Sequence, residues 1–441
     1  MKYKLLSSEE ESTVRNMAYQ YFRNIDKNNI QNSDRLFGIE VEFSIINNEN
    51  KLQPGFSETL SHDLANYNVV PELGSYQIEI NPPPLKLENN CFQKLYQILQ
   101  QSRSMLEEKA SNHAVQIVPI GLPFFIHDTL FTKLMNNFTQ KNRYLVSAKY
   151  FGNFNQEGVF VPYKHSGGFL LPGDTGVTVI NELHVQVQAL NVPDLINLFN
   201  YSQMITAPLV CLGANSGITN GKELKNIEQQ IEIFEKSEGV YDGLTDYPRV
   251  GLFPGYIQSL YEFMNVALSF KPLYYPSDGQ AVTAFDLMLG IYYSWTRIRY
   301  GLTPTPHFRI EFRPLSVQPT MIENIALSEF YIKSLLALVH QKTPLLAEEH
   351  IRYNFTSAVQ HGMKAKLFWN LGDGLNKYPV NIILGSLLNK ISDGEYSYII
   401  EQRIKDQKSP TEKLIEQTNK HGYTNAINEY KDCFRNEIPY I

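Results

Sequence analysis

The segment FGIEVEF, Phe37–Phe43, decides the fold class because polar and apolar residues alternate along it. On a strand, residues two positions apart point to the same face, so Glu40 and Glu42 share one side and the aliphatic and aromatic residues share the other. Such alternation is typical of an antiparallel strand with one face in the core. We predict a strand that carries two carboxylates on its polar side.

Three further segments repeat this pattern: QIEIN at Gln77–Asn81, HVQVQ at His184–Gln188 and RIEFR at Arg309–Arg313. Taken singly, each is also compatible with an ordinary solvated sheet face. Taken together, their polar sides hold Glu, His, Gln, Asn and Arg but no Lys, and the glutamates would repel one another unless cations neutralise them. The four segments predict a sheet whose polar face lines a cleft with divalent metal ions.

The rest of the chain alternates helical spacing with loops, which favours an α+β fold. Ser7 and Glu10 have the spacing of a capping box and begin a helix. We see no internal repeat and no linker, and we expect one large α+β domain with a mainly helical end. The expected regions are a helical arm over 1–34, the main catalytic domain over 35–340, and a helical C-terminal extension packed on it over 341–441.

Composition excludes several classes of protein. The 441 residues are 43% hydrophobic, so the chain can bury a large core, and a net charge of −6 provides no cationic field for nucleic acid or an anionic membrane. Three scattered cysteines form neither a disulfide framework nor a thiolate zinc site. No secretory signal or membrane-spanning stretch is recognisable, so we expect a cytoplasmic protein.

The predicted ligands indicate which ions and anions this cleft would hold. Carboxylates with one imidazole and no thiolate favour Mg²⁺ or Mn²⁺ over Zn²⁺. Arg309 and Arg313 flank Glu311 on the same strand face, where a guanidinium can pair with a phosphate or carboxylate. Metals and arginines on one surface are typical of phosphoryl transfer, whereas GITNGKEL, Gly217–Leu224, lacks the spacing and the Ser or Thr of a P-loop.

Seven segments resemble, in the same order, glutamate–cysteine ligases of the plant and bacterial carboxylate–amine ligase group. They are FGIEVEF, PELGSYQIEIN, HVQVQ, LVCLGANSG, DYPRVGLF, SWTRIR and RIEFRPLSVQPT, and the resemblance runs from about Phe37 to about Val339. It implies the glutamine synthetase catalytic fold, in which a curved antiparallel sheet carries metals on its polar face and helices on its apolar face.

The resemblance also implies two metal sites and ATP as the cofactor. Glu42, Glu72 and Glu79 would bind one Mg²⁺ or Mn²⁺ ion, and Glu40, His184 and Glu311 would bind the other. Two alternatives stay open. Glu72 lies outside the alternating pattern and could be a turn residue, and His184 could be hydrogen-bonded to protein groups and bind no metal.

The implied reaction passes the γ-phosphoryl group of ATP to a carboxylate, and an amine then displaces phosphate to leave an amide. The candidates for stabilising the phosphoryl group are Arg313 and Arg309, whereas Arg249 and Arg297 are candidates for phosphate or substrate carboxylate. We expect Arg299 to form a surface salt bridge. The implied cofactor contacts are Arg297, Arg313, Gln186 and Asn215.

Two departures from the family pattern affect the expected substrates, a small carboxylate such as glutamate and an amine. Gln186 stands where related ligases often have a second histidine, and we predict that it orients a substrate without transferring a proton. The loop Gly213–Leu224 differs too, and we expect it to form one wall of the amino-acid pocket. Two alternative functions stay open, namely a phosphotransferase on the same fold and a non-catalytic regulatory protein. The oligomeric state also stays open, and a homodimer is among the options.

Overall fold

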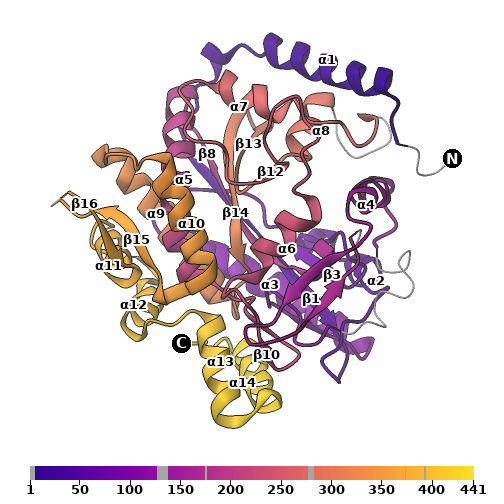
Figure 1. The fold of residues 1–441 in the computed structure, drawn as a ribbon, viewed down its shortest axis with the longest axis vertical. Coiled ribbons are helices and arrows are strands. Elements are labelled where there is room, and N and C mark those ends of the chain that lie inside the picture. The colour runs from indigo at the N-terminus through magenta and orange to yellow at the C-terminus, as the bar shows by residue number, and fades with distance from the viewer. Residues whose placement is uncertain (1–4, 127–137, 174–175, 277–282, 373, 392–393) are drawn as a thin grey trace.

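An antiparallel sheet covered by helices organises the fold, seen in Figure 1 in a computed structural model. The structure describes residues 5–126, 138–173, 176–276, 283–372, 374–391 and 394–441. The strands of the main sheet are β1 (Leu36–Ile46), β2 (Val69–Pro71), β3 (Gln77–Ile80), β4 (Leu85–Lys86), β5 (Gln116–Val118), β8 (Glu182–Gln188), β13 (Thr296–Gly301) and β14 (His307–Ser316). Their spatial order is β13-β14-β8-β1-β3-β2, with β4 and β5 paired to β1.

The four strands predicted from alternation are confirmed, and they are neighbours in the centre of the sheet. Their register puts Glu40 directly opposite His184, and Glu42 directly opposite Glu79. Because facing residues on paired strands project to the same side, the polar residues of all four strands gather on one face.

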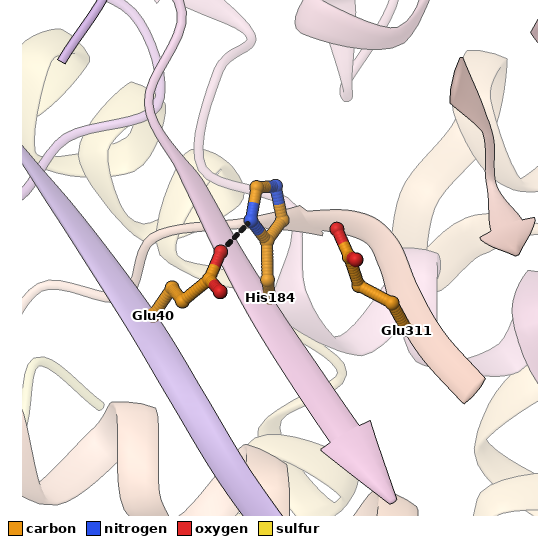
Figure 2. A group of neighbouring side chains, drawn as sticks. All are labelled: Glu40, His184 and Glu311. Carbon is orange, nitrogen blue, oxygen red and sulfur yellow. Dashed lines mark hydrogen bonds and ion pairs between the residues drawn. The ribbon is translucent and has the colours of Figure 1, made fainter. Parts of the chain in front are cut away.

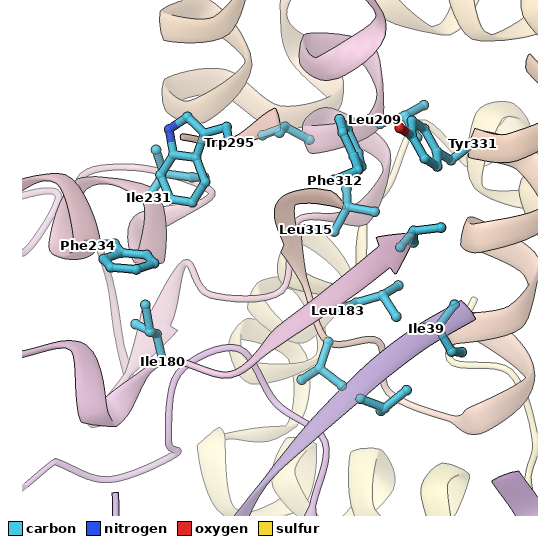
Figure 3. Packing of buried hydrophobic residues seen from close by; sticks show 14 of the residues in the cluster. Ile39, Ile180, Leu183, Leu209, Ile231, Phe234, Trp295, Phe312, Leu315 and Tyr331 are labelled. Atoms are coloured by element: carbon cyan, nitrogen blue, oxygen red, sulfur yellow. The ribbon is translucent and has the colours of Figure 1, made fainter. Parts of the chain in front are cut away.

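Helices cover the apolar face of the sheet. They include α3 (Cys91–Asn112), α5 (Val192–Gly213) and α9 (Met321–Gln341). Phe312 of β14 lies beside Tyr331 of α9 (Figure 3), and the two rings stack with centroids 4.1 Å apart. Among the described residues, α5 alone is long and apolar enough to span a bilayer, but most of it is buried inside the protein, as in a core helix.

The remaining elements before residue 342 lie outside the main sheet. The arm helix α1 has the predicted capping box between Ser7 and Glu10, and its Phe22 stacks on Phe285 of α8. These elements are α1 (Ser8–Asn24), α2 (Ser57–Ser61), α4 (Asn142–Phe154), α6 (Gln229–Glu238), α7 (Leu260–Ala267), α8 (Ala284–Gly290), β6 (Val159–Pro162), β7 (Gly168–Leu171), β9 (Ile218–Thr219), β10 (Lys222–Glu223), β11 (Val250–Gly251) and β12 (Tyr293–Ser294).

The C-terminal region is not purely helical, because a β-hairpin lies within it. Its elements are α10 (Glu348–His361), β15 (Lys366–Asn370), β16 (Leu375–Pro379), α11 (Val380–Leu388), α12 (Ser397–Asp406), α13 (Pro410–His421) and α14 (Tyr423–Asn436). Arg403 of α12 is buried and forms an ion pair with Glu323 of α9 at 2.7 Å. The region is therefore attached to the core through a buried charge pair, while the boundaries at 34 and 340 stay predictions.

A buried carboxylate connects the loop after α5 to the sheet. Glu228 accepts hydrogen bonds from the backbone N–H of Asn215 at 2.9 Å and from the hydroxyl of Ser316 at the end of β14. Burial raises the pKa of Glu228 to about 8, although these hydrogen bonds oppose the shift. Because the ordinary value of 4.5 applies after unfolding, the folded chain binds one more proton than the unfolded chain between about pH 5 and pH 8.

We predict that Glu228→Gln stabilises the protein increasingly as pH rises from 5 to 8. In the wild type, the proton held by Glu228 makes the free energy of unfolding fall as pH rises through this window, by up to about 1.4 kcal/mol per pH unit. Glutamine does not titrate, so the variant lacks this contribution. Chemical denaturation at several pH values measures the difference, with Glu416→Gln as the control, because its lysine partners Lys408 and Lys420 lower the pKa of Glu416 to about 2, below this window. A difference between wild type and E228Q that does not change with pH would contradict the prediction.

Candidate active site

A cavity of about 560 Å³ lies on the polar face of the sheet. Strands β1, β3 and β8 supply several of its acidic residues, and side chains from α4, α6, α8, β12 and β13, some of them acidic, close it. Of the predicted residues, those that line the cavity are Glu40, Glu42, Glu72, Glu79, His184, Arg297 and Arg313. The sequence therefore identified most of the charged lining.

The first candidate metal centre consists of Glu40, His184 and Glu311, drawn in Figure 2. One ligand atom of each residue lies within 4.8 Å of the others. His184 Nδ1 is 2.8 Å from a carboxylate oxygen of Glu40 on the neighbouring strand. Burial would lower the pKa of His184, but its hydrogen bonds to carboxylates outweigh that effect and raise the pKa to about 10.

The second candidate centre includes Glu182, which the sequence reasoning missed. Ligand atoms of Glu42, Glu182 and His184 lie within 4.8 Å of one another. Glu182 Oε2 is 2.7 Å from His184 Nε2 and accepts a hydrogen bond from Arg313 at 3.0 Å, while its backbone N–H donates to Glu42 at 2.7 Å. Extending the alternation two residues before His184, to ELHVQVQ, would have found it.

Glu72 and Glu79 line the same cavity but belong to neither of these two groups. Burial raises the pKa of Glu79 well above its usual range, and the nearby carboxylates Glu40, Glu72 and Glu42 add to the effect. Burial likewise raises the pKa of Glu42 well above its usual range, with Glu72 and Glu182 adding to it. This end of the cavity holds more negative charge than its protein surroundings compensate.

The donor set fits a divalent cation. Carboxylate oxygens with one imidazole are the ligands that Mg²⁺ and Mn²⁺ prefer, and repulsion among buried carboxylates is relieved when a cation binds. Moreover, Glu182 Oε1 is buried and has no hydrogen-bond partner among the described residues, although a buried oxygen of this kind normally has one.

At the opposite end of the row of acidic residues, arginines compensate the negative charge of Glu311. Glu311 accepts hydrogen bonds from Arg297 at 2.8 Å and from Arg313 at 2.9 Å. Burial would raise the pKa of Glu311, but these two guanidinium groups hold it well below its usual range. Arg299 also lines the cavity, with its Nε 3.9 Å from Glu311, which corrects the expectation of a surface salt bridge.

Gln186 and Arg309 line a second cavity of about 380 Å³, which adjoins the first at Glu40 and Asn81. The Gln186 amide donates to Glu40 at 2.5 Å, and its oxygen accepts a hydrogen bond from Arg309 Nε. The two residues thus form a chain of hydrogen bonds to the first metal-ligand group, and their side chains do not line the larger cavity.

Arg249 and Asn215 line neither cavity, which corrects the expectation for both. Arg249 is completely buried, where it pairs with Asp242 and donates to two backbone carbonyls. Asn215 is buried as well, and its amide donates to Tyr430 of α14 and to a backbone carbonyl, both at 2.7 Å. Both side chains are therefore buried among protein partners, although Arg249 Nε and Asn215 Oδ1 have no hydrogen-bond partner among the described residues.

The loop 213–224 does not line the larger cavity, so the expected wall of an amino-acid pocket is not formed there. Instead the loop packs against the C-terminal helices. The backbone N–H of Gly217 donates to the Thr411 hydroxyl at 3.1 Å, and an added Cβ at Gly221 would lie 3.4 Å from the Tyr423 ring. The loop that departs from the family pattern is therefore in contact with α13 and α14.

Comparison with known proteins agrees with this geometry. The sequence model of glutamate-cysteine ligase family 2 (GCS2) matches residues 36–373. The chain belongs to this family. It is accordingly a ligase, as the sequence predicted, and the match extends past the predicted domain end at 340. No curated protein matches the sequence.

Solved structures show the same fold at low sequence identity. Glutamate–cysteine ligase from Francisella tularensis, crystallised in complex with AMP, has a TM-score of 0.57 and 14% identity, and the alignment covers 91% of this chain and 88% of that one. A bifunctional glutathione synthetase from Pasteurella multocida has a TM-score of 0.52 and 13% identity, over 97% of this chain and 55% of that one. These likenesses show that the chain shares its overall fold with both structures.

We predict that Glu311→Gln weakens Mn²⁺ binding by at least about tenfold, since it removes one charge from the first ligand group at constant volume. Titration followed by electron paramagnetic resonance measures free Mn²⁺ directly, without any turnover. Glu416→Gln removes the same charge from α13, outside the cavity, and serves as the control. An unchanged dissociation constant in a folded E311Q variant would exclude Glu311 as a ligand.

Proposed function

We propose that this ligase uses ATP to join a small carboxylic acid to an amine through an acyl phosphate, at a site that holds divalent metal. The observation that carries the proposal is one continuous row of acidic residues and an imidazole across four paired strands, flanked by arginines in the same cavity. A metal-dependent phosphoryl transfer needs these groups on one surface.

Two sets of residues would hold the metals. Glu40, His184 and Glu311 form one set, and Glu42 with Glu72 and Glu79 forms the other, with Glu182 next to both. Bound Mg²⁺ or Mn²⁺ would offset the charge of the phosphate oxygens and so allow two anionic substrates to approach each other. The unpartnered Glu182 Oε1 and the raised pKa values of Glu42 and Glu79 support this assignment.

The second cavity is our candidate for the adenosine part of ATP. It adjoins the acidic cavity at Glu40, and its lining combines the Tyr300 ring and apolar residues with Arg309. Aromatic and apolar surfaces with a few polar groups are typical of such sites. The Francisella ligase was crystallised with AMP, which supports nucleotide use by this chain as well.

In the first step, a carboxylate oxygen of the acid attacks the γ-phosphorus and the bond to ADP breaks. Arg313 is the proposed stabiliser of the transferring group. Glu311 and Glu182 hold its two terminal nitrogens at 2.9 and 3.0 Å, and its Nε–H has no partner among the residues that the structure describes. Arg297 donates to Glu311 and to two carbonyls, so its proposed task is to orient Glu311.

In the second step, the amine nitrogen attacks the acyl carbon and phosphate leaves. The proposal therefore requires amide, ADP and phosphate in equal amounts. Incubation with ATP, Mg²⁺ and a panel of amino acids and amines, followed by mass spectrometry and phosphate measurement, tests it. A phosphorylated product without phosphate release would indicate a phosphotransferase, and the absence of any turnover would indicate a regulatory protein.

We predict that Arg313→Lys slows turnover by about 30-fold to 1000-fold. An ammonium group cannot keep the two-pronged contacts to Glu311 and Glu182 while it also meets a phosphoryl group, and the cost corresponds to about 2–4 kcal/mol of transition-state stabilisation. Steady-state kinetics measure the change, and Arg352→Lys on the exposed face of α10 is the control. A rate within threefold of wild type would show that Arg313 does not act on the phosphoryl group.

We predict that Gln186→Ala raises the dissociation constant for ATP by about fivefold to tenfold. The substitution breaks the link between Glu40 and Arg309 in the second cavity, and one or two lost hydrogen bonds account for this magnitude. Equilibrium binding of a non-hydrolysable ATP analogue checks it. Unchanged nucleotide affinity together with a new amine preference would instead favour the original prediction that Gln186 contacts the amino-acid substrate.

A further inference from the structure

An acidic residue outside both metal-ligand groups lines the larger cavity. Glu238 is the last residue of α6, and its side chain is 6% exposed. No group of the described residues donates a hydrogen bond to its carboxylate, although buried carboxylates normally have such partners. On the same helix, Glu235 accepts a hydrogen bond from Trp295 Nε1 at 2.9 Å and does not line the cavity.

Aromatic rings flank this part of the cavity. Phe234 of α6 and Tyr293 of β12 both line it, with ring centroids 5.7 Å apart, and Figure 3 shows Phe234 on the side of the core near Trp295. The guanidinium carbon of Arg313 lies 5.9 Å from the centroid of each ring. The compartment formed by Glu238, Phe234 and Tyr293 is therefore next to the arginine that we assign to the phosphoryl group.

The charges that face Glu238 come from several elements. Burial raises the pKa of Glu238 to about 8, Arg249 and Arg313 oppose this, and Glu182 adds to it. Burial also raises the pKa of the Tyr293 phenol, which lies close enough to Glu238 to interact with it electrostatically. A carboxylate in these surroundings gains stability from a cation that enters the cavity and can hold a proton near neutral pH.

The chemistry of the substrates indicates which of them supplies that cation. ATP and the carboxylic acid are anions, so Glu238 would repel both. A primary amine in neutral solution is mainly an ammonium ion, which pairs with a carboxylate and also favours aromatic faces. Before it can attack an acyl carbon, the ammonium ion must lose a proton.

We propose that Glu238 binds the ammonium group of the amine substrate and accepts its proton, which makes it a catalytic residue for the second step. The proposal rests on the proposed ligase function. One N–H bond of the ammonium ion breaks as an O–H bond forms on Glu238, and the freed lone pair attacks the acyl carbon. The C–O bond to phosphate then breaks with its electron pair on the phosphate, which takes up the second amine proton.

Glu238→Gln with two nucleophiles tests the proposal. The acid and amine are the pair found in the substrate panel, and hydroxylamine is the second nucleophile because it is already uncharged at neutral pH. We expect the variant to form the amide about 100-fold more slowly, on the scale of general-base catalysis, and to keep hydroxamate formation within about threefold. The amide rate of the variant should keep rising with pH above 8, where the wild-type rate levels off.

Glu235→Gln is the matched control, because it removes a partly buried carboxylate from the same helix outside the cavity. It should leave both reactions unchanged. Equal losses of amide and hydroxamate formation in E238Q, or no loss of either, would overturn the inference. If E238Q does not fold, E238D replaces it, and a hydroxamate loss as large as its amide loss would again overturn the inference. A wild-type protein that forms neither product with any pair would overturn the proposed function and, with it, this inference.

Discussion

Repulsion between carboxylates on one face of the sheet is the constraint on which the site depends. Glu42 and Glu79 face each other directly across β1 and β3, a pairing that is unfavourable on an ordinary sheet. The protein pairs Glu311 at the far end directly with Arg297 and Arg313, whereas burial and neighbouring carboxylates raise the pKa values of Glu42 and Glu79. This negative charge is what the divalent cations of the proposed reaction would neutralise.

The same cavity separates its charges in space. The arginines of β13 and β14 are near Glu311, whereas Glu72 and Glu79 lie toward β2 and β3. Beyond the arginines, Glu238 occupies an aromatic compartment of its own. This separation of charges fits the proposed reaction. Once metals were bound, the anionic acid and the anionic nucleotide would meet positive charge, and the cationic amine would meet the negative charge of Glu238.

Alternation along the strands was sufficient to predict the sheet, its polar face and most metal-ligand candidates, because strand geometry is local. Glu182 was within reach of the same rule and was overlooked. Arg249 and Asn215 could not be assigned in this way, since an arginine or amide meets a ligand only where protein partners leave it free. Their partners, Asp242 and Tyr430, come from a loop and from the last helix, and no local pattern reveals such contacts.

The position of α14 has a consequence for how the chain acquires its structure. Phe434 packs against Phe43 on the apolar side of β1, with ring centroids 6.3 Å apart, so β1 is covered by a helix that lies far from it in the sequence. Until α14 has been synthesised, that patch of β1 lacks its aromatic partner. Contacts that span most of a sequence slow folding and prolong the exposure of apolar strands. A chain that has not yet acquired α14 thus leaves an apolar patch of β1 uncovered, where it can associate with other chains.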